Sequence, residues 1–85
     1  MITKDQTGET WLSASLADKK EYVERKCRGA AEEGLGTADP STVLKALDEF
    51  FALPGNRHRT ISMAFGNLFT AIAMGIDYKP LLPPT

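Results

Sequence analysis

The sequence contains one cysteine, one histidine and one tryptophan among 85 residues, and this scarcity excludes several classes of protein. The single Cys27 allows no disulfide within the chain, and one histidine beside one cysteine gives no zinc-ligand pattern. The formal net charge is −1, from 10 basic and 11 acidic residues, so no strong field attracts nucleic acid. We expect a reduced, cytoplasmic protein that holds no metal and no other cofactor.

Sequence motifs of common enzymes are also missing. The chain has no phosphate-binding G-x-x-x-x-G-K-S/T loop, no dinucleotide-binding G-x-G-x-x-G and no metal-binding H-E-x-x-H. His58 and Cys27 fall in separate predicted helices, and Cys27 lies on an apolar stripe where a reactive thiolate is disfavoured. The first residues, MITKDQTGET, lack the basic and apolar segments of a secretory signal. We therefore predict a binding protein without catalytic residues.

What the sequence does contain is a pattern of three helices in one domain, residues 1–85. Apolar residues recur at helical spacing over residues 15–76. A polar, extended arm over 1–14 precedes them, and an extended, proline-rich tail over 77–85 follows. We predict an all-α fold, a three-helix antiparallel bundle with a small core, because so short a chain buries only about 60 to 65 per cent of its surface.

The first predicted helix begins near Ser15 and ends at Gly34. Ser15 and Asp18 have the S-x-x-D spacing with which a helix caps its own first turn. Its apolar stripe comprises Leu16, Val23, Cys27 and Ala30. Lys20 projects close to that stripe, so its ammonium group either reaches water past a packed stem or faces a ligand.

The second predicted helix begins at Asp39 and Pro40, a capping carboxylate followed by a proline in the first turn. Its core stripe comprises Val43, Leu44, Leu47, Phe50 and Phe51. Asp48 and Glu49 are expected on the opposite side. The sequence LPGN over residues 53–56 breaks the helix, and so short a connection places the next helix antiparallel to it.

The third predicted helix spans about residues 57–74 and carries apolar or small side chains nearly all round. One broad face comprises Ile61, Ala64, Phe65, Leu68, Phe69, Ala71, Ile72 and Ile76. The opposite side has no charge and comprises Ser62, Met63, Gly66, Asn67, Thr70, Ala73 and Met74. Residues 60–76 fall short of the about 20 mainly apolar residues that cross a bilayer, so we expect no membrane contact. Gly75 predicts a left-handed cap at the C-terminus of this helix, with Ile76 folding back onto the last turn.

The uncharged side of the third helix needs a cover from elsewhere. The first two helices are amphipathic and offer one apolar stripe each, which can cover the broad apolar face but not the opposite side as well. Ser62, Gly66 and Thr70, spaced by four residues, let another helix approach closely, and methionines beside them fill irregular gaps. We predict a homo-oligomer, most simply a two-fold dimer, formed through this helix. Alternatively, the tail and the N-terminal arm, including Trp11 and Leu12, fold over that side of the same chain.

Arg57, His58 and Arg59 gather at the start of this helix, where the helix dipole already favours an anion. With Asn56 as N-cap, the first-turn N–H groups and two guanidinium groups would suit a phosphate or a carboxylate. Alternatively, the carboxyl end of the preceding helix, with its acidic residues 48 and 49, neutralises these cations.

The run over residues 59–74 resembles the closing helix of the small phage anti-CBASS proteins, and the likeness is carried by Arg59, Ile61, Ala64, Leu68 and Met74. Members of that family are helical hairpins that oligomerise and sequester cyclic oligonucleotide signals. The resemblance implies a ligand held between protomers. Tyr22 would then stack on a base, and the phosphates would lie against Arg57, Arg59 and either Lys20 or Lys26.

The sequence is compatible with two functions. In the first, a self-associating helical module of phage or bacterial type inhibits or assists a protein partner. In the second, an oligomer holds a phosphorylated small ligand, such as a cyclic oligonucleotide, at the start of the third helix. The tail, DYKPLLPPT, is either a strap over apolar surface or, through its P-x-x-P pattern, a ligand for an aromatic-lined groove. Nucleic-acid binding is not expected, because the third helix is too apolar to enter a DNA groove.

Overall fold

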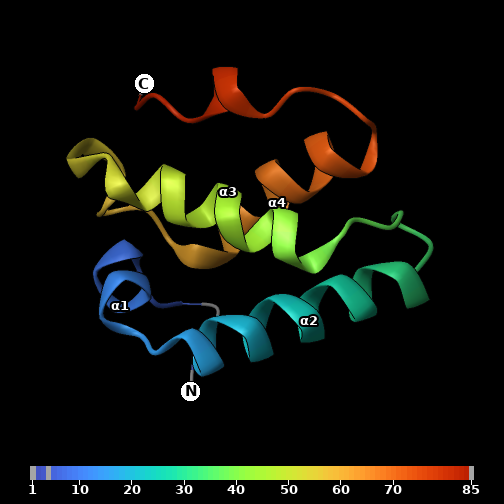
Figure 1. The fold of residues 1–85 in the computed structure, drawn as a ribbon, viewed down its shortest axis with the longest axis horizontal. Coiled ribbons are helices and arrows are strands. Elements are labelled where there is room, and N and C mark those ends of the chain that lie inside the picture. Colours follow the sequence, from blue (N-terminus) through green and yellow to red (C-terminus); the bar gives the residue numbers. More distant parts are fainter. Residues whose placement is uncertain (1, 4, 85) are drawn as a thin grey trace.

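The computed structural model describes residues 2–3 and 5–84, and within these ranges the chain is all-α, as predicted. Its helices are α1 (Gly8–Ser13), α2 (Leu16–Glu32), α3 (Pro40–Ala52) and α4 (Ile61–Ala73). Two 3₁₀ turns, η1 (Pro54–Asn56) and η2 (Lys79–Leu81), lie before and after α4. Figure 1 shows α3 returning beside α2, and α4 turning back behind α3. Residues 1, 4 and 85 of the predicted arm and tail lie outside the described residues.

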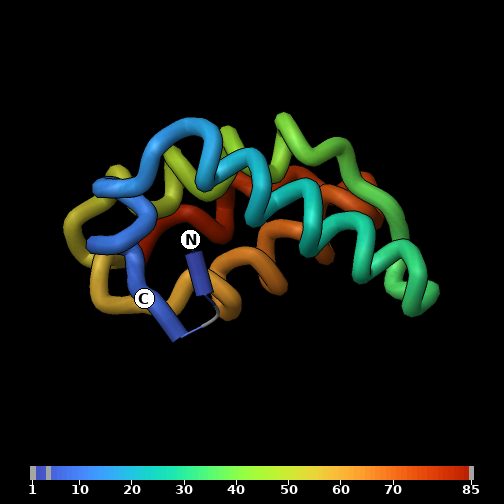
Figure 2. The backbone as a smooth tube through the Cα atoms, turned by 90° about the horizontal axis from the view of Figure 1, so that it is seen from below, coloured from blue at the N-terminus to red at the C-terminus, as the bar shows by residue number. Residues whose placement is uncertain are grey.

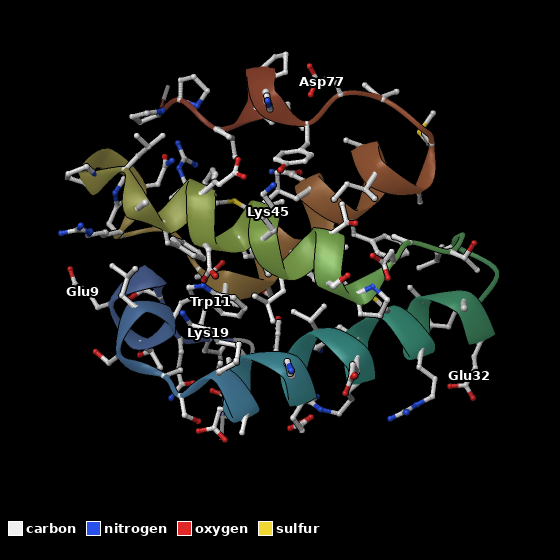
Figure 3. All side chains as sticks on the ribbon, viewed as in Figure 1. Glu9, Trp11, Lys19, Glu32, Lys45 and Asp77 are labelled. Atoms are coloured by element: carbon white, nitrogen blue, oxygen red, sulfur yellow. The ribbon has the colours of Figure 1, made fainter. Side chains whose placement is uncertain are left out.

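The prediction of an extended N-terminal arm was wrong, because residues 8–13 form α1 and insert Trp11 into the core. The Trp11 side chain is fully buried, and its indole N–H donates to Asp48 Oδ1 on α3 at 2.8 Å. Figure 3 shows Lys19 of α2 beside Trp11, and the Lys19 ammonium also reaches Asp48, at 3.0 Å. Asp48, whose side chain is 44% exposed, is therefore the acceptor that joins α1, α2 and α3.

The segment before α1 pairs with the corner that precedes α4. Gly8 N–H donates to the Arg59 carbonyl at 3.1 Å, and Ile61 N–H donates to the Gln6 carbonyl at 2.8 Å. Figure 2 shows the two segments together at one end of the molecule. Gly8 has no room for a side chain, since a Cβ atom there would lie 2.9 Å from Phe51 Cε1. This close approach explains why the chain has a glycine as the first residue of a helix.

Helix α2 begins and ends as predicted. The Ser15 hydroxyl accepts from the Asp18 N–H at 3.1 Å. Gly34 adopts a positive φ of 77°, and Leu35 N–H returns to the Ala30 carbonyl at 2.9 Å, which closes a Schellman motif. The predicted core stripe needs a correction at its start: Leu16 is 58% exposed.

Helix α3 follows the predicted pattern on its core side. Val43, Leu47 and Phe51 are fully buried, and Pro40 is its first residue. The Asp39 carboxylate does not cap the helix through a backbone N–H; it accepts instead from the hydroxyls of Ser41 and Thr42, at 2.6 and 2.9 Å. These hydrogen bonds lower the pKa of Asp39.

Helix α4 begins four residues later than predicted, at Ile61, because Thr60 is its N-cap. The Thr60 hydroxyl accepts from the Met63 N–H at 3.3 Å. The C-terminal cap is confirmed: Gly75 has a φ of 72°, and Ile76 N–H donates to the Ala71 carbonyl at 2.8 Å. Ile76 itself was wrongly placed on the core face, since it is 54% exposed.

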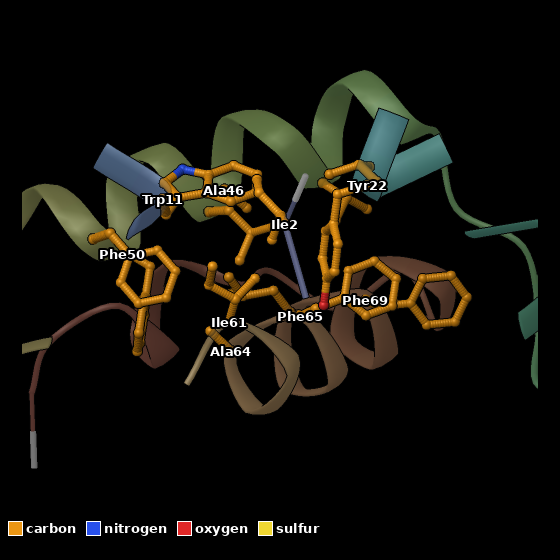
Figure 4. Packing of buried hydrophobic residues seen from close by; sticks show 14 of the residues in the cluster. Ile2, Trp11, Tyr22, Ala46, Phe50, Ile61, Ala64, Phe65 and Phe69 are labelled. Atoms are coloured by element: carbon orange, nitrogen blue, oxygen red, sulfur yellow. The ribbon is translucent and has the colours of Figure 1, made fainter. Parts of the chain in front are cut away.

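The core lies where α2, α3 and α4 meet, and aromatic rings fill much of it. Figure 4 shows the Tyr22 ring reaching from α2 toward Phe65 of α4. These two rings pack edge to face with centroids 6.1 Å apart, and Phe65 stacks on Phe69 at 5.3 Å. Such pairs add about 0.5–1.5 kcal/mol each beyond the area they bury.

The tail returns over α3 and α4 of the same chain, which agrees with the predicted strap. The prediction of an extended tail was wrong at Lys79–Leu81, which form the 3₁₀ turn η2. Asn56 Nδ2 donates to the Leu82 carbonyl at 2.6 Å, and the Tyr78 hydroxyl donates to Glu49 Oε1 at 3.2 Å. Glu49, like Asp48, thus binds a segment that is distant along the chain. In the described part of the chain, no helix is both long and apolar enough to cross a membrane.

Candidate functional site

The side of α4 that faces away from the core is open to solvent. We call it the α4 outer face; it comprises Ser62, Met63, Gly66, Asn67, Thr70, Ala73 and Met74. Ala73 is half-buried and the other members are exposed, with Met63 at 42% and Met74 at 68%. None of these side chains carries a charge. The face therefore combines low charge with exposed apolar groups, a combination typical of surfaces that another molecule covers.

The middle of the α4 outer face has little side-chain bulk. An added Cβ atom at Gly66 would meet no other atom within 4 Å, so the space above that residue is free. The Thr70 hydroxyl donates to the Gly66 carbonyl at 2.7 Å and is thereby satisfied within the helix. A second helix could approach this backbone closely without leaving the Thr70 hydroxyl buried and unsatisfied.

The alternative cover, by the chain's own ends, is realised only in part. Trp11 packs against Tyr22 and Phe51 in the core and Leu12 stays 40% exposed, so neither of these two residues covers the α4 outer face. The tail reaches one edge of the α4 outer face and leaves a cleft of about 190 Å³ beside it. Met63 and Asn67 belong to both the cleft and the α4 outer face.

The predicted anion site takes a different form in the structure. Asn56 was wrong as an N-cap: it is 1% exposed, and its Nδ2 donates to the carbonyls of Phe50 and Leu82. Arg57 Nε donates to the Phe51 carbonyl at 3.5 Å, next to the carboxyl end of α3, where a cation is favoured. The alternative of neutralisation by the carboxyl end of α3 is thus met in part by Arg57, whereas the hydrogen bonds of Asp48 and Glu49 go to Trp11, Lys19 and Tyr78.

The first turn of α4 also has few N–H groups to offer an anion. Ile61 N–H is taken by the Gln6 carbonyl and Met63 N–H by the Thr60 hydroxyl. His58 is exposed, and Arg59 lines the cleft beneath the tail. The three cations are neighbours in sequence, yet the structure gives them different surroundings instead of one common site.

The other predicted ligand residues lie elsewhere. Lys20 is exposed and borders a groove of about 310 Å³ beside Pro40, at the start of α3, with its charge at the surface. Arg57, in contrast, follows the end of α3. The 13 residues of this helix put about 20 Å between its start, beside Lys20, and its end, beside Arg57. The structure thus does not bring these cations together within one chain.

Tyr22 was wrong as a ring that stacks on a ligand. Its side chain is fully buried, and Arg25 and Lys26 cover the ring at 5.5 and 5.8 Å from its centroid. Burial raises the pKa of Tyr22, and the nearby Arg25 charge opposes that shift. No base could reach either face of this ring without displacing the core.

Asn56 and Asp48 are the residues whose importance the sequence did not reveal. Each connects segments that are distant along the chain, through the tail for Asn56 and through α1 and α2 for Asp48. A polar residue next to a helix end, as Asn56 is, commonly caps that helix, so the pattern pointed to the wrong partner. Among the described residues, no three His, Cys, Asp or Glu side chains are grouped to hold a metal ion.

Comparisons with protein-family models, with curated proteins and with solved structures found no match to this chain. The likeness of residues 59–74 to the anti-CBASS helix therefore stays a prediction. The candidate site consequently depends on geometry alone, and the α4 outer face is its largest feature.

Proposed function

We propose that the protein is a non-enzymatic helical interaction module that self-associates through the α4 outer face and acts on a protein partner as an inhibitor or accessory factor. The observation that carries this proposal is the uncharged α4 outer face, in which Ala73 is half-buried and the other members are exposed. Among the described residues, the tail reaches only one edge of it. The described parts of the chain contain no metal-ligand cluster, and the cysteine is buried with a raised pKa.

A two-fold arrangement suits the order of residues on this face. In an antiparallel pair centred on Gly66, Ser62 of each copy lies opposite Thr70 of the other, so small residues meet along the contact. Met63 and Met74 flank the contact and can adapt their shape to it. The pairing buries apolar surface without stranding a charge.

The expected association is weak and reversible. Thirteen residues of helix extend about 20 Å, so a single helix pair buries less than the about 800 Å² per partner of a standard interface. We expect a dimer with a dissociation constant in the micromolar range or weaker, in exchange with the monomer. The exposed face would then be available to a heterologous partner as well.

Light scattering over a concentration series tests the proposal with a matched pair of variants. Gly66→Lys places a charge on the α4 outer face, and Gly29→Lys places the same charge on α2, where a Cβ also meets nothing within 4 Å. The mass of the wild type and of Gly29→Lys should rise toward twice 9.3 kDa, while Gly66→Lys stays at 9.3 kDa. Equal masses for the two variants would reject the α4 outer face as the interface.

A phosphorylated ligand at the start of α4 is less well supported, because Asn56 and Tyr22 are buried and the first-turn N–H groups are engaged. Thermal unfolding with cyclic di- and trinucleotides distinguishes the two functions. Ligand at 100 times its dissociation constant stabilises a protein by about 2.7 kcal/mol, and a shift of that size would favour the ligand-binding alternative.

A further inference from the structure

The cleft between α4 and the tail has a wall that is mostly apolar. Its volume is about 190 Å³. Its lining comprises Phe50, Asn56, Arg59, Met63, Ala64, Asn67, Leu68, Pro80, Leu81 and Pro83. Engineered apolar cavities of about 150 Å³ hold benzene, so this cleft has room for a group the size of one aromatic ring.

Asn56 is the unusual member of that wall. Its side chain is 1% exposed, and both N–H groups of Nδ2 are used, toward the Phe50 carbonyl at 2.9 Å and the Leu82 carbonyl at 2.6 Å. These two acceptors fix the orientation of the amide. Its Oδ1 is consequently left without a hydrogen-bond donor, one of two such buried side-chain atoms in the described residues. A buried acceptor without a donor is unfavourable, and an incoming N–H or O–H group relieves that cost.

We propose that the cleft binds a one-ring apolar group carrying a single N–H or O–H donor, such as a phenol. The ring would pack against Leu68 and Leu81, and the donor would reach Asn56 Oδ1. Oδ1 is not exposed to solvent, so the donor reaches it only when the cleft opens further, and the Phe50 carbonyl still holds the amide in its orientation. An acceptor-only group would face Oδ1 without gaining a hydrogen bond.

The donor-bearing ring can be a free small molecule or a tyrosine side chain of another protein. A second copy of this chain does not supply it readily, because Trp11 and Tyr22 are fully buried and Tyr78 already donates to Glu49. The proposal therefore goes beyond self-association and does not depend on it. The cleft does adjoin the α4 outer face, through Met63 and Asn67.

Titration of ¹⁵N-labelled protein with phenol and with toluene tests the proposal, since the two rings differ in one donor. We expect shifts at the amides of Ala64, Leu68 and Leu81, and a dissociation constant for phenol about fivefold below that for toluene, equivalent to ~1 kcal/mol. N-acetyltyrosinamide is the third arm. Binding of phenol alone would assign the cleft to a free small molecule, and binding of both would assign it to a tyrosine side chain.

Two variants place the ligand in the cleft. Met63→Trp fills the rim and should abolish the phenol shifts, whereas Ser62→Trp, exposed on the same helix but outside the cleft, should preserve them. Both positions lie on the α4 outer face, so loss of self-association would affect them alike and cannot imitate this difference. Equal affinity for phenol and toluene, no binding of phenol, or unchanged shifts in Met63→Trp would each overturn the proposal.

Discussion

Replacing Tyr22 by phenylalanine should stabilise the protein, which is the reverse of the usual effect of a core substitution. The Tyr22 side chain is fully buried, and its hydroxyl has no hydrogen-bond partner. Phenylalanine keeps the ring, and with it the edge-to-face contacts to Phe65 at 6.1 Å and to Trp11 at 6.3 Å. Only the unsatisfied hydroxyl is lost.

The magnitude follows from the cost of burying that hydroxyl. A buried polar group without a partner costs about 1–3 kcal/mol, and the small void left by one oxygen atom takes back part of the gain. We expect Tyr22→Phe to raise the free energy of unfolding by about 1 kcal/mol, measured by urea denaturation. For a domain of this size, that gain corresponds to about 4–8 °C in the melting temperature.

Tyr78→Phe is the matched control, because the Tyr78 hydroxyl does have a partner in Glu49, at 3.2 Å. Removing it should lower the free energy of unfolding by about 0.5–1.5 kcal/mol, opposite in sign to the effect at Tyr22. If Tyr22→Phe instead destabilised the protein by 1 kcal/mol or more, the hydroxyl would have a partner after all, and the reasoning would be refuted.

Three further predictions concern the backbone and one carboxylate. Gly8→Ala should lower the free energy of unfolding by about 1–3 kcal/mol in urea denaturation, because its Cβ would press on Phe51, and a loss under 0.5 kcal/mol would contradict that packing. Gly66→Ala should stabilise the monomer by about 1 kcal/mol through helix propensity, yet weaken self-association. Gly29→Ala should stabilise the monomer in the same way and leave self-association unchanged. A dimer of Gly66→Ala as tight as that of the wild type would argue against a close approach of the two helices. Asp39 has a lowered pKa, so its contacts with the two hydroxyls stabilise the fold fully above the ordinary pKa of 3.8 and less as the pH falls through the lowered pKa. Asp39→Asn should remove this pH dependence of the free energy of unfolding at acid pH. The same acid dependence in wild type and variant would refute the role of Asp39.

Local signals in the sequence predicted the helix ends well where a single residue decides them. Ser15, Gly34 and Gly75 each act through one hydrogen bond or one positive φ angle, and all three positions were predicted correctly. Helix α1 was missed because six residues are too few for a periodic pattern to emerge. The start of α4 was misplaced because Thr60 and Asn56 are both plausible caps, and the choice is made by pairing with residues 6–8.

The candidate site likewise has one part that the sequence predicts and another that it does not. The uncharged side of α4 follows from helical periodicity alone, so its members could be predicted from the sequence and are exposed or half-buried in the structure. The surroundings of Tyr22, Asn56 and Asp48 depend on partners at least six residues away, as in the contact of Asp48 with Trp11. A pattern within one helix carries no information about such contacts, which is why the predicted ligand residues did not converge.

In the proposed dimer, the α4 outer faces of two copies meet. An isotope-filtered NOE experiment on a mixture of labelled and unlabelled protein observes that contact directly, at concentrations where the mass exceeds 9.3 kDa. We expect intermolecular NOEs from Gly66 to Gly66 and from Ser62 to Thr70. Intermolecular NOEs confined to other surfaces, or a 9.3 kDa particle with none at millimolar concentration, would contradict it.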